Sequence, residues 1–248
     1  MTPRLLALDS STDQLAVALI APGVELCRNE AGGPLASARL VPALLQLLDR
    51  AGIGLAQVQA IAFGQGPGAF TGLRTACAVA QGLAFAHDTP VLAIDSLLIV
   101  AEDARAQAAA GASAAAAQDW WVAVDARMDE VYAARYRFDG VAWQVRVAPQ
   151  LWTLPALTEA WGTDPPRQVA GSAVTAFADR LPWGQARLCG SCQDRAAALL
   201  RLAQSAWARG RGQAADQALP LYLRDKVALT TTERLARREA LAAGATAA

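Results

Sequence analysis

The most unusual stretch of the chain that could do chemistry is the glycine-rich loop Gly64-Gln-Gly-Pro-Gly-Ala-Phe-Thr-Gly-Leu-Arg74. It lies between a predicted buried strand and a predicted helix, and its glycines permit positive φ angles and a close approach of the backbone. The N-terminus of the following helix carries a partial positive charge, which predicts phosphate binding. The loop lacks the Gly-Lys-Ser/Thr ending of a P-loop and the Gly-x-Gly-x-x-Gly order of a dinucleotide-binding loop. A purely structural junction between strand and helix therefore remains an equal alternative.

A second candidate is the segment Asp9-Ser10-Ser11-Thr12, which follows the first predicted strand. A carboxylate followed by hydroxyl side chains resembles the first phosphate loop of actin-like and sugar-kinase-like ATPases, in which an aspartate orients Mg²⁺-bound water. The usual glycine of that loop is absent here. A turn in which the side chains bond their own backbone is the stronger interpretation, and a nucleotide site at this position would be vestigial.

Carboxylates and cysteines elsewhere in the chain give weaker signals. Asp125, Asp129 and Glu130 flank a predicted hairpin turn, where acidic residues are common, so we do not expect catalysis from them. Cys189 and Cys192 form a lone CxxC pair. A zinc site would need two further ligands at matching spacing. A redox role is a minor alternative.

Composition excludes several classes of protein. The chain has 248 residues, 22 basic and 22 acidic side chains, and four cysteines. It has no apolar run of the ~18 residues that a membrane span needs, and Asp9 comes too early for a signal peptide. Neutral charge with scattered arginines argues against autonomous nucleic-acid binding. His87 is the only histidine, which excludes sites with two histidine ligands, and we expect it to cap a helix C-terminus. These features predict a cytoplasmic globular protein.

The predicted elements that position these residues occur as two similar series of a strand meander followed by helices. In the first series, strands are predicted at 5–8, 15–20, 24–28, 58–63 and 91–94, with helices at 37–50, 71–87 and 97–110. We expect Ser96 to be the N-cap of the last of these helices. In the second series, strands are predicted at 121–125, 131–136, 141–147 and 168–170, with helices at 155–161, 174–180 and 194–209.

This repetition predicts an α/β fold of two related lobes with a cleft between them. The low-complexity stretch 111–118 marks the boundary, so the lobes are predicted at 1–110 and 119–227. Residues 228–248 have little apolar periodicity and are expected to form a flexible tail.

The predicted helix 71–87 is apolar around nearly its whole circumference and must be covered on both sides. Ala76, Ala80 and Ala84 are spaced by four and form a small-residue face that would let another helix approach closely. Two interpretations remain open: a core helix covered entirely by its own chain, or a helix that also contacts a partner.

Four stretches of the chain together resemble a known family. The first motif is Leu6-Ala-Leu-Asp-Ser-Ser-Thr12, the second Gly66-Pro-Gly-Ala-Phe-Thr-Gly-Leu-Arg74, the third Val124-Asp-Ala-Arg-Met-Asp-Glu-Val-Tyr132 and the fourth Pro220-Leu-Tyr-Leu-Arg224. In this order and at these intervals they resemble the TsaB (YeaZ) family, subunits of the bacterial machinery that makes threonylcarbamoyladenosine in tRNA. The resemblance extends from about Leu5 to Val227.

The resemblance implies a two-lobed actin/sugar-kinase/Hsp70-like (ASKHA) fold and a non-catalytic role. In this family the subunit pairs with TsaD through the two helices of the first lobe, and the ATPase TsaE joins them. TsaD carries a metal-binding histidine pair and transfers a threonylcarbamoyl group to the adenosine next to the anticodon. The resemblance thus implies no cofactor on this subunit, ATP and metal on its partners, and tRNA contact only through the complex.

Two departures from the family pattern stand out. Ala69 replaces the serine that the family usually has in the second motif, which weakens a phosphate-binding interpretation. The CxxC pair has no counterpart in the family.

The expected site residues fall into three groups. The partner interface is expected at Leu40, Leu44, Ala76, Val79, Ala80 and Leu83, chosen by helical spacing, and the same apolar face would serve a homodimer of the isolated chain. The family motif loop comprises Gly66, Pro67, Gly68, Phe70, Thr71, Gly72 and Arg74, and the vestigial nucleotide site Asp9, Ser10, Ser11 and Thr12. The alternative function is a stand-alone ATP-dependent phosphotransferase of the sugar-kinase type. The glycoprotease label of the wider superfamily is improbable with one histidine and no HExxH.

Overall fold

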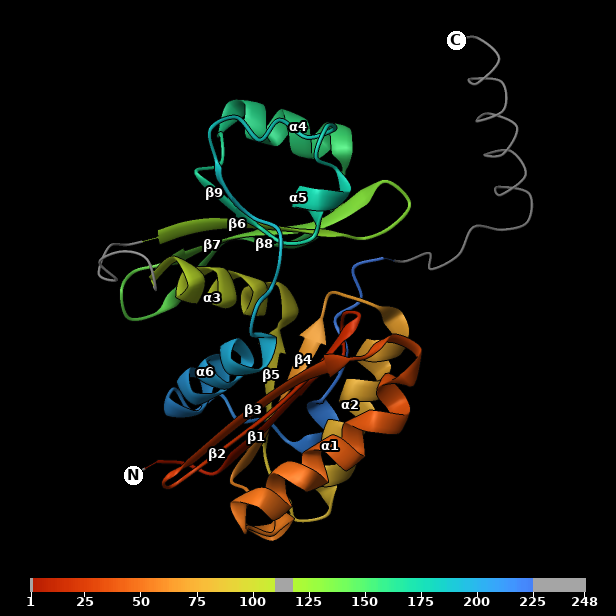
Figure 1. Ribbon diagram of the computed structural model, residues 1–248, viewed down its shortest axis with the longest axis vertical. Coiled ribbons are helices and arrows are strands. Elements are labelled where there is room, and N and C mark those ends of the chain that lie inside the picture. Colours follow the sequence, from red (N-terminus) through yellow and green to blue (C-terminus); the bar gives the residue numbers. More distant parts are fainter. Residues whose placement is uncertain (1, 110–117, 225–248) are drawn as a thin grey trace, which may run out of the picture.

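Two five-stranded mixed sheets with the same topology form the two lobes of the protein (Figure 1). The computed structural model describes residues 2–109 and 118–224. In each sheet the first three strands form an antiparallel meander. The fourth strand pairs parallel with the first, and the fifth pairs parallel with the fourth. The α/β class and the two-lobed repeat predicted from the sequence are therefore confirmed.

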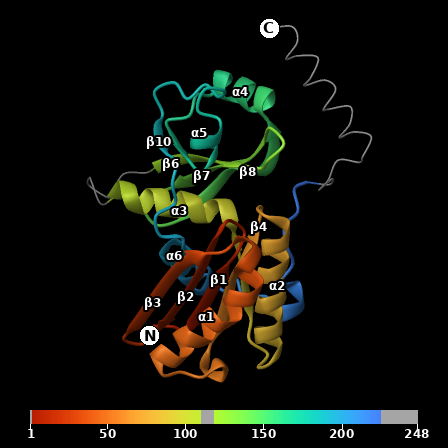
Figure 2. The same cartoon turned by 45° about the vertical axis from the view of Figure 1, so that its right-hand side comes forward.

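The first sheet contains β1 (Leu5–Asp9), β2 (Gln14–Ala21), β3 (Val24–Ala31), β4 (Ala60–Gly66) and β5 (Val91–Asp95), in the order β3-β2-β1-β4-β5. Helices α1 (Ala36–Ala51) and α2 (Phe70–Phe85) lie side by side on one face of it (Figure 2). Single turns of 3₁₀ helix occur at Gly33–Leu35, Leu55–Gln57 and Ala215–Gln217. Every residue of β1 is buried because helices cover both faces of the sheet.

The second sheet contains β6 (Gln118–Asp125), β7 (Glu130–Phe138), β8 (Trp143–Thr153), β9 (Gln168–Ala170) and β10 (Arg187–Cys189), in the order β8-β7-β6-β9-β10. Helices α4 (Leu154–Thr163) and α5 (Ala173–Ala176) lie on its outer side (Figure 1). β10, which contains Cys189, was not predicted. The helix predicted at 174–180 is wrong in extent, because regular α-helix ends at Ala176 and turns follow.

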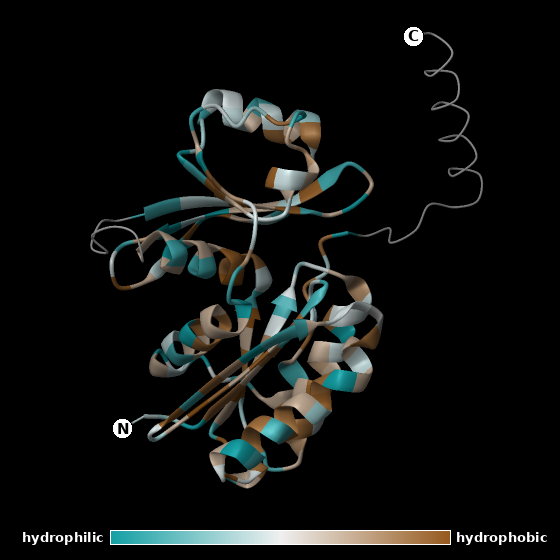
Figure 3. Ribbon diagram, viewed as in Figure 1, coloured by the Kyte–Doolittle hydropathy of each residue, from teal (hydrophilic) through white to brown (hydrophobic). Residues whose placement is uncertain are grey.

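The third helix of each repeat packs on the sheet of the other repeat. Helix α3 (Ser96–Ala109) shares a hydrophobic core with β6 and β7, whereas α6 (Arg195–Ala208) packs against β1 and β2. The two helices also contact each other, so they form the layer between the lobes (Figures 1 and 2). The first sheet lies between this layer and the helices α1 and α2. Hydrophobic residues are concentrated in its strands (Figure 3).

This exchange corrects the predicted lobe boundary. The second lobe was expected to extend over 119–227, but α6 belongs to the core of the first lobe. The chain after α6 also returns to the first sheet, where Gln213 and Val91 exchange backbone hydrogen bonds of 2.9 Å. The boundary stretch 111–117 and the tail 228–248 lie outside the described residues.

Two capping predictions are wrong. The N-terminus of α3 is capped by Asp95, whose Oδ1 accepts a hydrogen bond of 2.9 Å from the amide of Leu97, and the hydroxyl of Ser96 points elsewhere. His87 lies beyond the end of α2 and is exposed, and within the described part of the chain its imidazole makes no hydrogen bond to a helix carbonyl. Among the helices described, none is long and apolar enough to cross a membrane.

Candidate functional site: a cleft formed by four motifs

The four motifs meet at a cleft between the lobes. A cavity of about 620 Å³ lies there, and its lining includes Ser11, Gly68, Arg127 and Arg224, one residue from each motif. The first and second motifs enter from the carboxyl ends of β1 and β4, and the third motif enters as the turn between β6 and β7. Residues that are more than a hundred positions apart in sequence thus line one cavity.

The glycines of the second motif are explained by close packing against the first motif. A Cβ atom at Gly68 would lie 2.4 Å from the carbonyl oxygen of Ser11, and one at Gly72 would lie 1.8 Å from that of Ser10. The two motifs are also joined by hydrogen bonds from the amide of Ala69 to Ser11 O (2.7 Å) and from Ser10 Oγ to Gly72 O (2.8 Å). The structure therefore favours the structural interpretation of this loop.

Asp9, the centre of the expected vestigial nucleotide site, is fully buried and is paired with Arg195. Oδ2 of Asp9 accepts a 2.6 Å hydrogen bond from Nε of Arg195 and a 3.0 Å bond from the hydroxyl of Ser11. Nη2 of Arg195 also donates to Ser11 Oγ at 2.9 Å. On the other side of the carboxylate, Ser96 Oγ lies 3.4 Å from Oδ1. Oδ2 of Asp9 is thus already bonded to the guanidinium and the Ser11 hydroxyl, and the carboxylate has no exposed surface for a hydrated cation.

The electrostatics of this pair keep Arg195 charged. Burial is the largest single effect and lowers the pKa of Arg195, but the carboxylate of Asp9 and the neighbouring Cys192 together raise it by more, so the guanidinium remains ionised. Arg195 came from no motif and was missed in the sequence, where it is one arginine at the start of a predicted helix. Thr12, the remaining member of the expected site, makes only local hydrogen bonds with Gln14.

The third motif forms a strained turn in which Arg127, Met128 and Asp129 have φ angles of 64°, 59° and 61°. Each such left-handed residue costs roughly 1–2 kcal/mol unless it is glycine. Arg224 of the fourth motif compensates this cost, since its Nη2 donates to the carbonyl of Ala126 at 2.9 Å and lies 2.6 Å from the carboxylate of Glu130.

The carboxylates of this turn have structural partners. Asp125 accepts from the amide of Arg127 at 2.8 Å, and Asp129 pairs with Arg180 at 2.8 Å. Both carboxylates are therefore held by contacts with the turn and with a neighbouring arginine. In residues 2–109 and 118–224, no three His, Cys, Asp or Glu side chains are grouped as a metal site.

The fourth motif also holds the second motif. Nε of Arg74 donates to the hydroxyl of Tyr222 at 2.9 Å, and its guanidinium lies 3.8 Å from the ring centroid of Phe70. The amide of Leu221 donates to the carbonyl of Gln65 at 2.7 Å. The beginning of α2 is therefore stabilised by Arg74, Phe70 and the 220–224 segment. In these contacts the side chains bond to one another and are not free to bind a ligand. Pro67 follows a cis peptide bond, and Thr71 is exposed on the first turn of α2.

Of the CxxC pair, Cys192 lines the cleft and Cys189 lies at the end of β10, and neither thiol is activated. Burial raises the pKa of Cys192 to about 12, even though Arg195 opposes this shift, and burial also raises the pKa of Cys189. Both cysteines are free, and Sγ of Cys189 lies 3.5 Å from Oε1 of Gln107. A redox role would need a stabilised thiolate, so these surroundings disfavour it.

The structure contradicts most of the expected partner interface. Leu40, Leu44, Ala76 and Ala80 are at most 1% exposed and pack in the core of the first lobe. Helical spacing identified the apolar faces of α1 and α2, and these faces cover the sheet. Of the predicted residues, only Val79 and Leu83 are half-buried at the edge of this core.

The outward faces of these helices carry a different set of residues. Leu45 of α1 is 51% exposed, Phe85 of α2 is 61% exposed, and Ala78 and Gly82 of α2 are also exposed. A Cβ atom at Gly82 would meet nothing within 4 Å. This outward face, which we call the α1–α2 face, is defined by Leu45, Ala78, Gly82 and Phe85.

Comparisons with known proteins agree with the motifs. A family model described as TsaD, tRNA N6-adenosine threonylcarbamoyltransferase, matches residues 35–159. The tRNA threonylcarbamoyladenosine biosynthesis protein TsaB of Haemophilus influenzae is 33% identical over 95% of this chain and 98% of its own length. The Escherichia coli protein of the same name is 31% identical over 91% of this chain and 96% of its own length.

Two solved structures from Pseudomonas aeruginosa are similar over their full lengths. One, described as an uncharacterized protein with similarity to peptidase YeaZ, is 40% identical with a TM-score of 0.80, over 90% of this chain and 100% of that one. The other, described as YeaZ, is 39% identical with a TM-score of 0.76, over 89% of this chain and 100% of that one.

Proposed function

Because the chain belongs to the TsaB (YeaZ) family, we propose that it is a non-catalytic docking subunit in the biosynthesis of tRNA threonylcarbamoyladenosine. It binds TsaD and holds it in an active conformation, and TsaE joins the two. TsaD transfers the threonylcarbamoyl group to the adenosine next to the anticodon, and ATP and metal are bound by the partner subunits.

The observation that carries the docking role is the exposed α1–α2 face. Phe85 of α2 and Leu45 of α1 place large apolar side chains in water, and Ala78 and Gly82, on the same face of α2 as Phe85, leave the α2 backbone open to close approach. Small residues on a helix surface allow a partner helix to pack at a short interaxial distance. A specific contact of this kind buries about 800 Å² on each partner.

The buried Asp9–Arg195 pair supports the non-catalytic part of the proposal. A phosphotransferase of the sugar-kinase type would need the carboxylate of Asp9 free for hydrated Mg²⁺, whereas here the guanidinium of Arg195 lies 2.6 Å from it. The chain also has a single histidine, His87, too few for the histidine pair expected of TsaD. The stand-alone phosphotransferase is therefore the weaker alternative.

The test is light scattering of the chain mixed with TsaD from the same organism, using Gly82→Arg and a matched control. Gly162→Arg is that control, because Gly162 also lies on an exposed helix surface, in α4, with open space at its Cβ position. We expect the native chain and Gly162→Arg to bind TsaD, and Gly82→Arg to lose at least tenfold in affinity.

Other outcomes would refute the proposal. Equal binding by both variants would exclude the α1–α2 face as the docking surface. Failure of the native chain to bind TsaD, together with ATP hydrolysis by the isolated chain, would favour the phosphotransferase. A homodimer of the isolated chain that Gly82→Arg dissociates would not refute the proposal, because it would show that a second copy and TsaD use the same face.

A further inference from the structure

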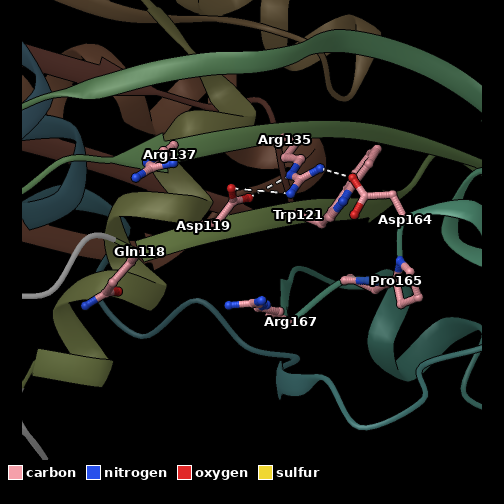
Figure 4. Close-up of a pocket in the computed structure, with 9 residues that line it drawn as sticks. Gln118, Asp119, Trp121, Arg135, Arg137, Asp164, Pro165 and Arg167 are labelled. Carbon is pink, nitrogen blue, oxygen red and sulfur yellow. Dashed lines mark hydrogen bonds and ion pairs between the residues drawn. The ribbon is translucent and has the colours of Figure 1, made fainter.

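A second cavity, of about 330 Å³, lies in the second lobe and belongs to none of the four motifs. It is situated where β6 begins and β7 ends, beside the connection from α4 to β9 (Figure 4). Arginines from two separate segments line it: Arg135 and Arg137 from β7, and Arg167 from the segment that precedes β9.

Only one of these arginines is neutralised by its surroundings. Nε of Arg135 lies 2.7 Å from Oδ1 of Asp119, and its Nη1 pairs with Asp164 on the other side. The side chains of Arg137 and Arg167 have no carboxylate or other hydrogen-bond partner within the described part of the chain, and both are exposed. With three arginines and two aspartates, the lining has a net charge of +1: Arg135 and its two aspartates sum to −1, and Arg137 and Arg167 contribute +2.

A further arginine lies at the same end of the sheet. β10 begins at Arg187, whose amide donates a 2.9 Å hydrogen bond to the carbonyl of Arg167. Arg187 is also exposed and has no ion-pair partner among the residues described. In the register of β10 and β9, Arg187 is level with Gln168, so its side chain lies on the opposite face of the sheet from Arg167 and Arg137, which share the face of Trp121.

One wall of the cavity has an unsatisfied hydrogen-bond donor. Trp121 is 5% exposed, and its indole N–H has no acceptor in the described structure. The ring is held edge-on between Trp161 and Trp152, with centroid distances of 5.9 and 6.4 Å. The indole N–H groups of Trp152 and Trp161 also have no acceptor in the described structure, and Trp121 is the member of this cluster that lines the cavity and can report on a ligand there.

We propose that this cavity binds a phosphate group of an RNA backbone through Arg137 and Arg167. Guanidinium groups bind phosphate oxygens with two parallel hydrogen bonds, and unpaired arginines beside a cavity are already free to do so. An RNA backbone carries repeated phosphates, of which this cavity would hold one. The identification of RNA rests on the proposed function, because a tRNA-modifying complex must hold tRNA. The cavity lies on the lobe opposite the α1–α2 face, so docking there leaves it accessible (Figures 1 and 4).

The first experiment uses the isolated chain and inorganic phosphate as the probe. The indole N–H resonance of Trp121, assigned with Trp121→Phe, is followed by NMR during a phosphate titration. We expect it to shift at millimolar phosphate in the native chain and in Arg146→Ala, an exposed arginine of β8 outside the cavity. The shift should be lost in the double variant Arg137→Ala/Arg167→Ala. No shift in the native chain would overturn the proposal without any bearing on TsaD docking.

The second experiment measures tRNA binding by the assembled complex with TsaD as a function of salt. Removing both arginines should weaken tRNA binding about tenfold or more and reduce the salt slope by roughly 1 in total, because the two arginines share one phosphate. The Arg146→Ala complex should be unchanged, and all variants should still bind TsaD. A phosphate-dependent shift of Trp121 with unaltered tRNA affinity would identify a site for a small phosphorylated molecule and overturn the RNA assignment. Loss of TsaD binding by the native chain would instead refute the proposed function and leave the first experiment valid.

Discussion

Nε of Arg195 lies 2.6 Å from Oδ2 of Asp9, and the two side chains are 2% and 0% exposed. The pair joins the end of β1 to the start of α6, which are 186 residues apart in sequence. It therefore connects the first strand of one repeat to the last helix of the other. A buried ion pair gains little over apolar side chains, but it is costly to break because one charge is left without a partner.

The first prediction concerns this pair. Arg195→Ala should lower the free energy of unfolding by about 3–5 kcal/mol, because it leaves the carboxylate of Asp9 buried and unpaired. The double variant Asp9→Asn/Arg195→Met should recover a large part of this loss. Urea denaturation of the three proteins measures both effects. A loss below 1 kcal/mol in Arg195→Ala would contradict the arrangement.

The second prediction concerns the N-terminus of α2. Ala69 is the N-cap residue, is exposed, and has no side-chain oxygen to accept a hydrogen bond from the first turn. Ala69→Ser should raise the free energy of unfolding by about 1 kcal/mol through this bond. Thermal denaturation should show a higher Tm for Ala69→Ser and no gain for Ala69→Val, which has no oxygen. A Tm that is unchanged or lower in the serine variant would show that the backbone at Ala69 cannot be capped.

Sequence patterns predicted most helices and strands correctly, because residues close together in the sequence decide where a helix or strand forms. The apolar periodicity of 37–50 and the short buried run 168–170 correspond to α1 and β9. The exchange of α3 and α6 between the sheets could not be predicted, because the period of an amphipathic helix says which face is buried and not which sheet covers it. The same limit explains the error in the interface: the spacing of Leu40, Leu44, Ala76 and Ala80 describes the core side of each helix.

The site was predicted only where its residues form continuous motifs. Asp9 and the glycine loop were found because their residue types are adjacent in sequence. Arg195 was not found, because Asp9, the partner that explains its burial, lies at the other end of the chain. Its place at the first turn of a helix, where the helix dipole disfavours a cation, is unusual but does not by itself indicate burial or a partner.

The third prediction concerns the reactivity of Cys192. Burial raises its pKa to about 12, so very little thiolate is present at pH 8. Alkylation of Cys192 by iodoacetamide should be at least a hundredfold slower in the folded chain than in the same chain unfolded in urea, because the thiolate is the reacting species. Mass spectrometry of peptides after timed quenching measures each cysteine separately. Similar rates in the two states would revive the redox interpretation of the CxxC pair.

The fourth prediction follows from a carboxylate that links the lobes. Asp95, at the end of β5, accepts a hydrogen bond from the hydroxyl of Tyr136 on β7 while its other oxygen caps α3. Burial raises the pKa of Asp95 to about 6, and the bonds from Tyr136 and the amides of Leu97 and Leu98 offset this only in part. An unfolded aspartate has a pKa of about 3.9. Between these values the folded state holds a proton that the unfolded state has released.

The sign of the pH effect follows from this difference. Because the folded state binds more protons, the contribution of Asp95 to the free energy of unfolding decreases as pH rises from about 4 to 6, by roughly 3 kcal/mol in total. Asp95→Asn keeps an oxygen for the amide of Leu97 and an N–H group for Tyr136 but cannot titrate. The native chain should therefore lose stability relative to Asp95→Asn over this interval, whereas Asp49→Asn, at an exposed position of α1, should follow the native chain. Urea denaturation at intervals between pH 4 and 7.5 gives these differences, and parallel curves for the native chain and Asp95→Asn would contradict the prediction.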